Sequence, residues 1–286
     1  MRAIQENQIG AMNMIYAHHS LGYMLDSFDR IGVKRFELYA PTPHFDAFMP
    51  SLSDTERFGK ILRQRGFTLT CVTPDQCTYP HNIAISDRDA REHAVRHFMR
   101  YLDVTAELGV GKMLCGAGWG DVDGNIEEAW KWSLDSLDRM ADYAEKKGVL
   151  LVFEILNEYE SDLVHHMEGM KRIRDSITSP ALKFCIDTVP VELEHRTLEE
   201  YFSVFGKQIV HIHMTDGSPL GHVPPGLGDY DMKKYFQTLS KYDYDGFVTI
   251  EICDTTWSNE PEKATAIGYQ CLRKALSDSN KLLTEA

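Results

Sequence analysis

Four apolar stretches of this sequence each carry one polar side chain, at or near the end of the stretch, that can bind a metal ion or move a proton. These side chains are Glu154, Asp187, His213 and Glu251. The first stretch, Leu150–Leu156, has six apolar residues of seven, which is typical of a strand buried on both faces in a parallel sheet. A charge inside such a run is costly to bury unless something pairs with it.

The spacing of these residues favours a shared metal site. Parallel α/β barrels build their active sites where the C-terminal ends of the strands meet, so we expect the four side chains to converge there. Any one of them alone is more often an ordinary core group, but three carboxylates placed together repel, and a divalent cation compensates them. Oxygen ligands with one imidazole suit Mn²⁺ best, with Mg²⁺, Co²⁺ or Zn²⁺ as alternatives.

The elements that must position these residues alternate regularly along the whole chain. The expected strands are Ile9–Ile15, Arg35–Tyr39, Thr68–Thr73, Lys112–Gly116, Val149–Leu156, Leu182–Asp187, Ile209–Met214 and Phe247–Cys253. The expected helices are Ser20–Ile31, Asp54–Arg65, Asp87–Leu108, Asn125–Lys147, Leu163–Ile177, Leu198–Phe205, Asp231–Tyr242 and Pro261–Leu276. Eight strand–helix units without a linker predict an α/β fold, a single (β/α)8 TIM barrel whose one domain spans residues 1–286.

An open doubly wound sheet is the alternative fold. That fold needs a glycine-rich phosphate-binding turn after its first strand, and the segment Tyr16–Ser20 contains no glycine. The length of 286 residues also agrees with one barrel, which typically takes ~250 residues.

Composition excludes several classes of partner and indicates a compartment. The net charge of −13 argues against a nucleic-acid partner, which requires a Lys/Arg-rich face. No apolar run approaches the ~18 residues that suggest a membrane span, and the N-terminus lacks the apolar core of a signal peptide. The six cysteines show no metal-finger spacing, and most of them fall in or near expected strands. We therefore expect a cytoplasmic enzyme.

The same residues resemble a known family, the xylose-isomerase-like barrels and within it the ketose 3-epimerases, over nearly the whole chain. Glu154–Glu160 is similar to the family segment with a metal-bound catalytic glutamate and a second glutamate six residues later. Asp187, His213 and Glu251 match the other three metal ligands in order and spacing. Pro224–Asp229 matches the family's proline–glycine turn after the seventh strand.

Two loops look closest to the fructoselysine 3-epimerase branch, namely the loop with Pro43 and His44 and the loop with Tyr79–Asn82. Epimerases of free ketohexoses usually place a substrate-binding His three residues after the aspartate and an Arg six residues after the histidine. Here those positions are Pro190 and Pro219. The resemblance therefore implies a substituted or larger ketose.

Further polar and aromatic residues follow the expected strands and are candidate substrate contacts. They are His44, Tyr79, His81, Trp119, Asn157, Glu160 and Asp216, with His222 as an additional candidate beside Asp216. Trp119 can stack on a sugar or plug the barrel mouth. His211 can assist its neighbour His213 or simply pack in the barrel.

The family resemblance and the pair of glutamates imply a sugar epimerase or isomerase that works at C3 through an enediolate. Glu154 and Glu251, on different strands, would serve as the acid/base pair on opposite faces of the sugar. The main alternative is a lyase on the same barrel, an inosose dehydratase or the catalytic subunit of a C-deglycosidase. An endonuclease-like phosphodiesterase and a metal-free sugar-binding module are weaker alternatives. The expected partners are a small-molecule sugar and further copies of the chain, plus a small partner subunit for a C-deglycosidase.

Overall fold

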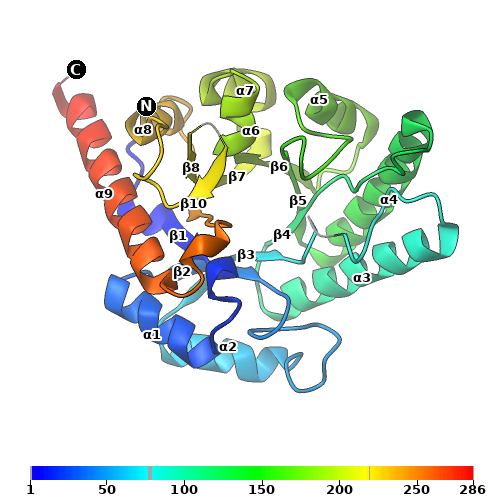
Figure 1. The fold of residues 1–286 in the computed structure, drawn as a ribbon, viewed down its shortest axis with the longest axis horizontal. Coiled ribbons are helices and arrows are strands. Elements are labelled where there is room, and N and C mark those ends of the chain that lie inside the picture. The colour runs from blue at the N-terminus through cyan, green and yellow to red at the C-terminus, as the bar shows by residue number, and fades with distance from the viewer. Residues whose placement is uncertain (1, 77–78, 219, 286) are drawn as a thin grey trace. The chain divides into compact units, whose positions relative to one another are not determined.

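In the computed structural model, which describes residues 2–76, 79–218 and 220–285, eight parallel strands form a closed barrel. The strands are β1 (Ile9–Met12), β2 (Arg35–Tyr39), β3 (Thr68–Thr73), β4 (Lys112–Cys115), β5 (Leu150–Glu154), β6 (Leu182–Asp187), β7 (Ile209–Met214) and β10 (Phe247–Ile250). They follow one another around the barrel in chain order, and β10 closes it by pairing with β1 (Figure 1). The predicted (β/α)8 barrel is confirmed, and the open-sheet alternative is wrong.

Each barrel strand is followed along the chain by one or two helices. These are α1 (Leu21–Ile31), α2 (Thr55–Gln64), α3 (Arg88–Glu107), α4 (Ile126–Lys147), α5 (Met167–Ser176), α6 (Thr188–Leu193), α7 (Leu198–Phe205), α8 (Met232–Lys241) and α9 (Pro261–Glu285). Side-chain caps start α1, α3 and α4, where Ser20, Asp87 and Asn125 each accept a backbone N–H of the first turn. Gly32 ends α1 at φ 91°, a conformation that favours glycine. No helix in the described ranges is both long and apolar enough to cross a membrane.

By its contacts the chain divides into two units, and each has its own strand pairings. The first comprises Met1–Leu38, Arg65–Thr70 and Ile186–Ala286, and the second comprises Tyr39–Gln64 and Cys71–Cys185. In the first unit, β10 pairs with β7 so that Thr249 lies opposite His213. In the second, β5 pairs with β6 so that Glu154 lies opposite Cys185. That residues 1–286 fold as one domain stays a prediction.

Four strands end earlier than the sequence predicts, and one of them, β4, stops a single residue early at Cys115. β1 stops at Met12, and a short 3-10 helix (Met14–Tyr16) takes up the rest of the predicted strand. β5 stops at Glu154 and β10 at Ile250. The residues just beyond, such as Ile155 and Ile252, are still buried, at 0% and 3% exposure. Burial thus continues past the last ladder hydrogen bond, and apolar character alone does not mark where a strand ends.

Two short elements near the predicted metal ligands are absent from the sequence prediction. Helix α6 begins directly after Asp187, whose side chain caps it. A two-stranded antiparallel hairpin, β8 (Asp216–Gly217) and β9 (Gly221–Val223), follows β7. Both elements are too short to show a periodic pattern. Two helices also differ from their predicted bounds. Helix α5 starts at Met167 instead of Leu163, and α9 extends nine residues beyond Leu276.

Candidate metal centre

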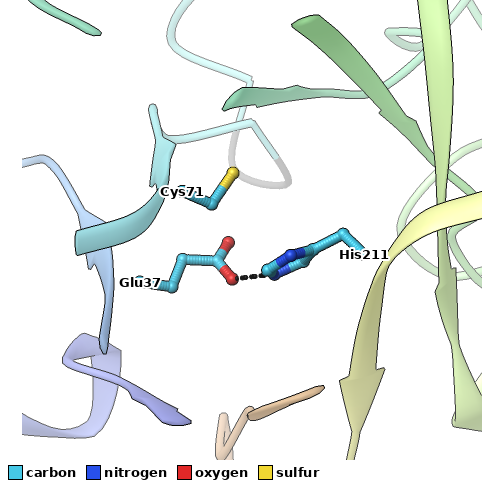
Figure 2. Close-up of side chains that lie close together, drawn as sticks. All are labelled: Glu37, Cys71 and His211. Carbon is cyan, nitrogen blue, oxygen red and sulfur yellow. Dashed lines mark hydrogen bonds and ion pairs between the residues drawn. The ribbon is translucent and has the colours of Figure 1, made fainter. Parts of the chain in front are cut away.

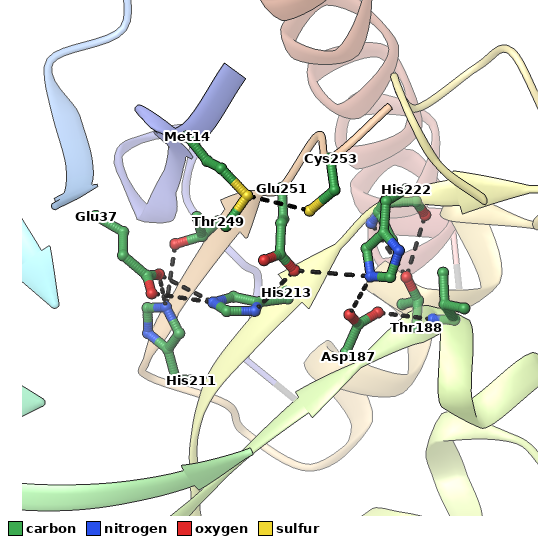
Figure 3. A network of polar contacts seen from close by, with 12 residues as sticks. Met14, Glu37, Asp187, Thr188, His211, His213, His222, Thr249, Glu251 and Cys253 are labelled. Carbon is green, nitrogen blue, oxygen red and sulfur yellow. Dashed lines mark hydrogen bonds and ion pairs between the residues drawn. The ribbon is translucent and has the colours of Figure 1, made fainter. Parts of the chain in front are cut away.

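Three of the predicted ligands lie together in the first unit. Asp187 is the last residue of β6, His213 lies near the end of β7, and Glu251 follows β10 directly. They are 2%, 0% and 7% exposed. Their ligand atoms lie within 4.8 Å of one another, and His213 Nδ1 is 3.0 Å from Glu251 Oε2 (Figure 3). Two carboxylates and an imidazole at this separation can hold a divalent cation.

Strand register and a helix cap explain why these side chains converge. Thr249 of β10 lies opposite His213, and Glu251 comes two residues after Thr249, just past the end of β10. Two residues is the repeat at which side chains of extended backbone point the same way. Asp187 Oδ1 accepts the backbone N–H of Val189 at 2.7 Å, which holds the carboxylate at the start of α6. The fold therefore presents these groups before any ligand binds.

Sequence reasoning missed a buried carboxylate, Glu37 on β2, which contacts His211 and His213 of β7. Its Oε2 lies 2.5 Å from His211 Nε2, and both of its oxygens lie 3.1 Å from His213 Nε2 (Figures 2 and 3). Burial by itself would raise the pKa of Glu37, but His213 and His211 outweigh that effect and hold the pKa well below its ordinary value. The available signal was a carboxylate between two apolar residues, Phe36 and Leu38, of an expected strand.

A second histidine that reaches the centre comes from the hairpin. His222, on β9, places Nε2 2.9 Å from Asp187 Oδ2 and 4.0 Å from Glu251 Oε2. Its carbonyl oxygen accepts the backbone N–H groups of Cys253 and Asp254 at 3.1 and 3.3 Å, which ties the hairpin to the segment after β10. The sequence pointed to His222 only as a residue for a polar substituent, whereas the structure places it against a predicted metal ligand.

The charges of the centre favour an ionised Glu251. Burial would raise its pKa, but His213 and then His222 lower it, and the net result is a pKa below the ordinary value. A buried, ionised carboxylate beside Asp187 and within reach of Glu37 makes this region strongly negative. A divalent cation bound here would therefore be stabilised by charge as well as by donor atoms.

Glu154 ends β5 in the second unit and is 5% exposed. Its ladder partner Cys185 is two residues before Asp187 in β6. The pKa of Cys115, on the neighbouring strand β4, is raised mainly by burial and further by the charge of Glu154. Glu154 is thus a buried carboxylate at a strand end, as the sequence predicted.

Four of the predicted substrate contacts form a cluster in the second unit. The rings of Tyr79 and Trp119 meet edge to face with centroids 6.0 Å apart, and the Tyr79 hydroxyl donates to the carbonyl of Glu160. Asn157 Nδ2 donates to Glu160 Oε2 at 2.7 Å. Asn82, which lies between Tyr79 and Trp119 in sequence, bonds both the N–H and the C=O of Trp119. Sequence-distant loops thereby present an aromatic and polar surface.

The two loop histidines are placed differently. His81 stacks on His97 of α3 with ring centroids 3.5 Å apart. Burial and then His93 lower the pKa of His81, and burial followed by His81 and His93 lowers that of His97 to about 3. His44 is 3% exposed. The structure therefore packs His81 onto a helix instead of adding it to the cluster of Tyr79 and Trp119.

Asp216 is buried and bonds backbone groups of its own loop, and its contact with substrate stays a prediction. It is 1% exposed, and its Oδ1 accepts the N–H groups of Gly217 and Tyr230 at 2.9 and 3.0 Å. Its Oδ2 accepts the N–H of Gly226 at 2.8 Å. Both oxygens thus hold the loop after β9 in place, as a short polar side chain often does in turns.

The structure describes only one of the two prolines, Pro190 and Pro219, that stand where ketohexose epimerases usually have a histidine and an arginine. Pro190 lies in α6 and is buried, so it offers no polar group near Asp187. Pro219 lies outside the described residues. His222 occupies the side of Asp187 that the hairpin covers.

Comparison with known proteins agrees with this geometry. A family model described as the xylose isomerase-like TIM barrel matches residues 25–275. The chain belongs to this family. Among its relatives, the fructoselysine 3-epimerase of Escherichia coli O157:H7 is 24% identical over 235 residues, which cover 81% of this chain and 84% of that protein. The L-ribulose 3-epimerase of Methylomonas sp. (strain DH-1) is 28% identical over 120 residues, which cover 42% of this chain and 41% of that protein.

Solved structures support the same family fold. A structure of L-ribulose 3-epimerase matches with a TM-score of 0.80 at 17% identity, over 96% of each chain. The 3-keto-D-glucoside 4-epimerase of Escherichia coli matches with a TM-score of 0.74 at 17% identity, over 96% of this chain and 99% of that one. The resemblance to xylose isomerase-like barrels of the ketose 3-epimerase group is confirmed.

Proposed function

We propose that this chain is a divalent-metal-dependent epimerase that inverts C3 of a ketose or substituted ketose. The observation that carries the proposal is the convergence of Asp187, His213 and Glu251 at strand ends of a xylose isomerase-like barrel. The relatives named above, a fructoselysine 3-epimerase and an L-ribulose 3-epimerase, act on ketose sugars by name. Aldose–ketose isomerisation uses the same groups with the proton moved between carbons.

The proposed ligands are Asp187, His213, Glu251 and Glu154. The β5–β6 register supports the addition of Glu154, because it lies opposite Cys185 at the same end of the sheet as Asp187. The oxygen-rich donor set favours Mn²⁺, with Mg²⁺, Co²⁺ or Zn²⁺ as alternatives. When bound, the cation would supply positive charge beside the substrate oxygens on which negative charge develops.

Glu154 and Glu251 are the proposed acid/base pair. Epimerisation removes a proton from one face of the carbon next to the carbonyl and returns a proton to the other face. The lowered pKa of Glu251 keeps it ionised near neutral pH, as a proton acceptor must be. Glu154 comes from a different strand, so the two carboxylates would approach the sugar from different sides.

The proposed sugar contacts are Tyr79, Trp119, Asn157 and Glu160, which already form one surface. An aromatic ring can cover the apolar face of a sugar, while the amide and carboxylate orient hydroxyl groups. Pro190 offers no side-chain hydrogen bond where ketohexose epimerases have a histidine. A substituted ketose, such as a fructosamine, is therefore the preferred substrate class, and His44 and His81 remain candidates for contacting its substituent.

A proton-exchange assay in heavy water tests the proposal. Wild-type protein with Mn²⁺ is incubated with ketoses, ketose phosphates and fructosamines, and deuterium at C3 and the epimer ratio are followed by NMR. Glu154→Gln and Glu251→Gln each remove one proton acceptor and should lower epimerisation by ~10²–10⁴-fold. Each variant should still exchange deuterium into one epimer only, and the two variants should prefer opposite epimers.

Glu158→Gln is the matched control, because Glu158 is exposed in the loop after β5. It should leave epimerisation and exchange unchanged. Epimerisation that survives in either Glu154→Gln or Glu251→Gln would refute the two-base assignment. Loss of water or of the sugar substituent, with no epimer formed, would instead identify the lyase alternative.

A further inference from the structure

Glu37 has no role in the proposed reaction, yet its burial demands an explanation. Its side chain is fully buried, at 0% exposure, on β2 in the interior of the first unit. Taking a carboxylate out of water is costly unless hydrogen bonds or charges compensate it. Two histidines of β7, His211 and His213, contact its carboxylate and contribute to this compensation. These histidines are 174 and 176 residues away in sequence.

The contact with Glu37 determines which ring nitrogen of His213 carries the proton. A neutral imidazole has one N–H and one lone pair, and the hydrogen bond made by one nitrogen sets the state of the other. A carboxylate only accepts, so His213 Nε2 must carry the hydrogen that points to Glu37, 3.1 Å away. The other ring nitrogen, Nδ1, faces Glu251 Oε2 at 3.0 Å, on the side where a cation would replace its hydrogen.

We propose that Glu37 is a positioning residue that accepts the Nε2–H of His213 and thereby directs Nδ1 into the metal centre. Histidines that bind metals commonly donate their other N–H to a carboxylate, which fixes the ring and increases its basicity. The inference rests on the proposed metal centre, and not on the epimerase reaction. Figure 3 shows Glu37 and Glu251 on opposite sides of the His213 ring, as this role requires.

His211 also contacts Glu37, and it helps to separate a positioning role of Glu37 from a purely structural one. Its Nε2 lies between Glu37 Oε2, at 2.5 Å, and the hydroxyl of Thr249, at 3.1 Å (Figure 3). His211 is thus bonded to the same carboxylate but is not one of the groups near Asp187 and Glu251. A purely structural role, in which Glu37 only ties β2 to β7, would depend on His211 as much as on His213.

The experiment compares Glu37→Gln with Thr249→Val in the metal-free and the Mn²⁺-bound protein. Glutamine keeps the shape of Glu37 but adds an NH₂ group that can donate to an imidazole nitrogen, which releases the constraint on His213. We expect Mn²⁺ affinity, measured by calorimetry, to fall ~10–100-fold. Long-range ¹H–¹⁵N spectra of metal-free protein should show His213 protonated at Nε2 in wild type and a mixture of tautomers in Glu37→Gln.

Thr249→Val is the matched control because it removes the hydroxyl that bonds His211 in the same buried network and leaves Glu37 in place. It should keep wild-type affinity and the wild-type His213 signal, assigned by its absence in His213→Gln. Equal Mn²⁺ affinity in wild type and Glu37→Gln, with only the melting temperature lowered, would overturn the proposal. If Glu37→Gln does not fold, a wild-type His213 without a proton on Nε2 overturns it. If wild-type protein binds no Mn²⁺, the proposed metal centre is refuted. The His213 signals of wild type and Glu37→Gln then still show whether Glu37 holds the proton on Nε2.

Discussion

At the scale of single residues, His97 shows how packing changes the response of a side chain to pH. Its ring stacks on His81, with centroids 3.5 Å apart, and on Phe48, with centroids 4.8 Å apart. Burial, followed by His81 and His93, lowers the pKa of His97 to about 3. An ordinary histidine in the unfolded chain titrates near ~6.5. Between these values the unfolded state binds a proton that the folded state does not.

The sign of the resulting pH dependence follows from this difference. Stability rises with pH wherever the unfolded state holds more protons, so His97 costs stability progressively as pH falls from 6.5 toward 3. One proton contributes a slope of at most ~1.4 kcal/mol per pH unit. We expect His97→Phe, which keeps an aromatic ring, to flatten the fall in unfolding free energy between pH 6.5 and 4.

Urea denaturation with a chelator present measures this effect at several pH values. His18→Asn, at an exposed histidine, is the control and should keep the wild-type pH profile. A His97→Phe profile parallel to that of wild type throughout this range would contradict the prediction.

At the scale of elements, the β8–β9 hairpin delivers His222 to Asp187, and Gly221 allows its two strands to approach. A Cβ added at Gly221 would lie 2.1 Å from the carbonyl oxygen of Asp216 and 2.5 Å from Gly217 Cα. Both are backbone atoms, so the hairpin must open. Gly221→Ala should displace the adjacent His222 and lower kcat/KM by roughly 10²-fold, the effect expected of a 1 Å misplacement at a reacting centre.

Gly111→Ala is the control for this change. Gly111 precedes β4, and an added Cβ there meets nothing within 4 Å. It should keep wild-type activity, and circular dichroism should show both variants folded. Unchanged kcat/KM in Gly221→Ala would mean that the position of the hairpin does not matter for catalysis.

At the scale of the whole molecule, binding of a metal to the folded chain should stabilise it. A ligand that binds only the native state adds RT ln(1 + [L]/Kd), which is ~2.7 kcal/mol at a concentration of 100 Kd. For a chain of 286 residues, we expect Mn²⁺ to raise Tm by several degrees and a chelator to reverse the change. The net charge of −13 adds to this effect, because a bound cation reduces self-repulsion.

Asp187→Asn separates a specific site from weak binding to the acidic surface. Asparagine can still cap α6, so the fold should persist, while one charged ligand is lost. Differential scanning calorimetry should therefore show no Mn²⁺-dependent rise in Tm for this variant. The metal site would be refuted if Asp187→Asn shows the same rise as wild type, or if wild type shows none.

The sequence alone predicted the features that depend on residues close together along the chain, such as strand bounds and helix caps. Arg35–Tyr39 and Leu182–Asp187 form strands with the predicted bounds. The caps at Ser20 and Asp87 are also local, since each side chain bonds an N–H three residues ahead. Eight strand–helix units joined by right-handed crossovers are compatible with few topologies, and the closed barrel is one of them.

The tertiary structure decided which buried polar groups meet. Glu37 contacts His213 across 176 residues of sequence, and His222 contacts Asp187 across 35 residues. Neither separation has a periodic signature in the sequence. Asp216 looked equally suited to substrate, but the loop amides of Gly226 and Tyr230 take its oxygens. The reason is physical: local pattern governs backbone conformation, whereas the partner of a buried charge depends on which strands the closed barrel brings together.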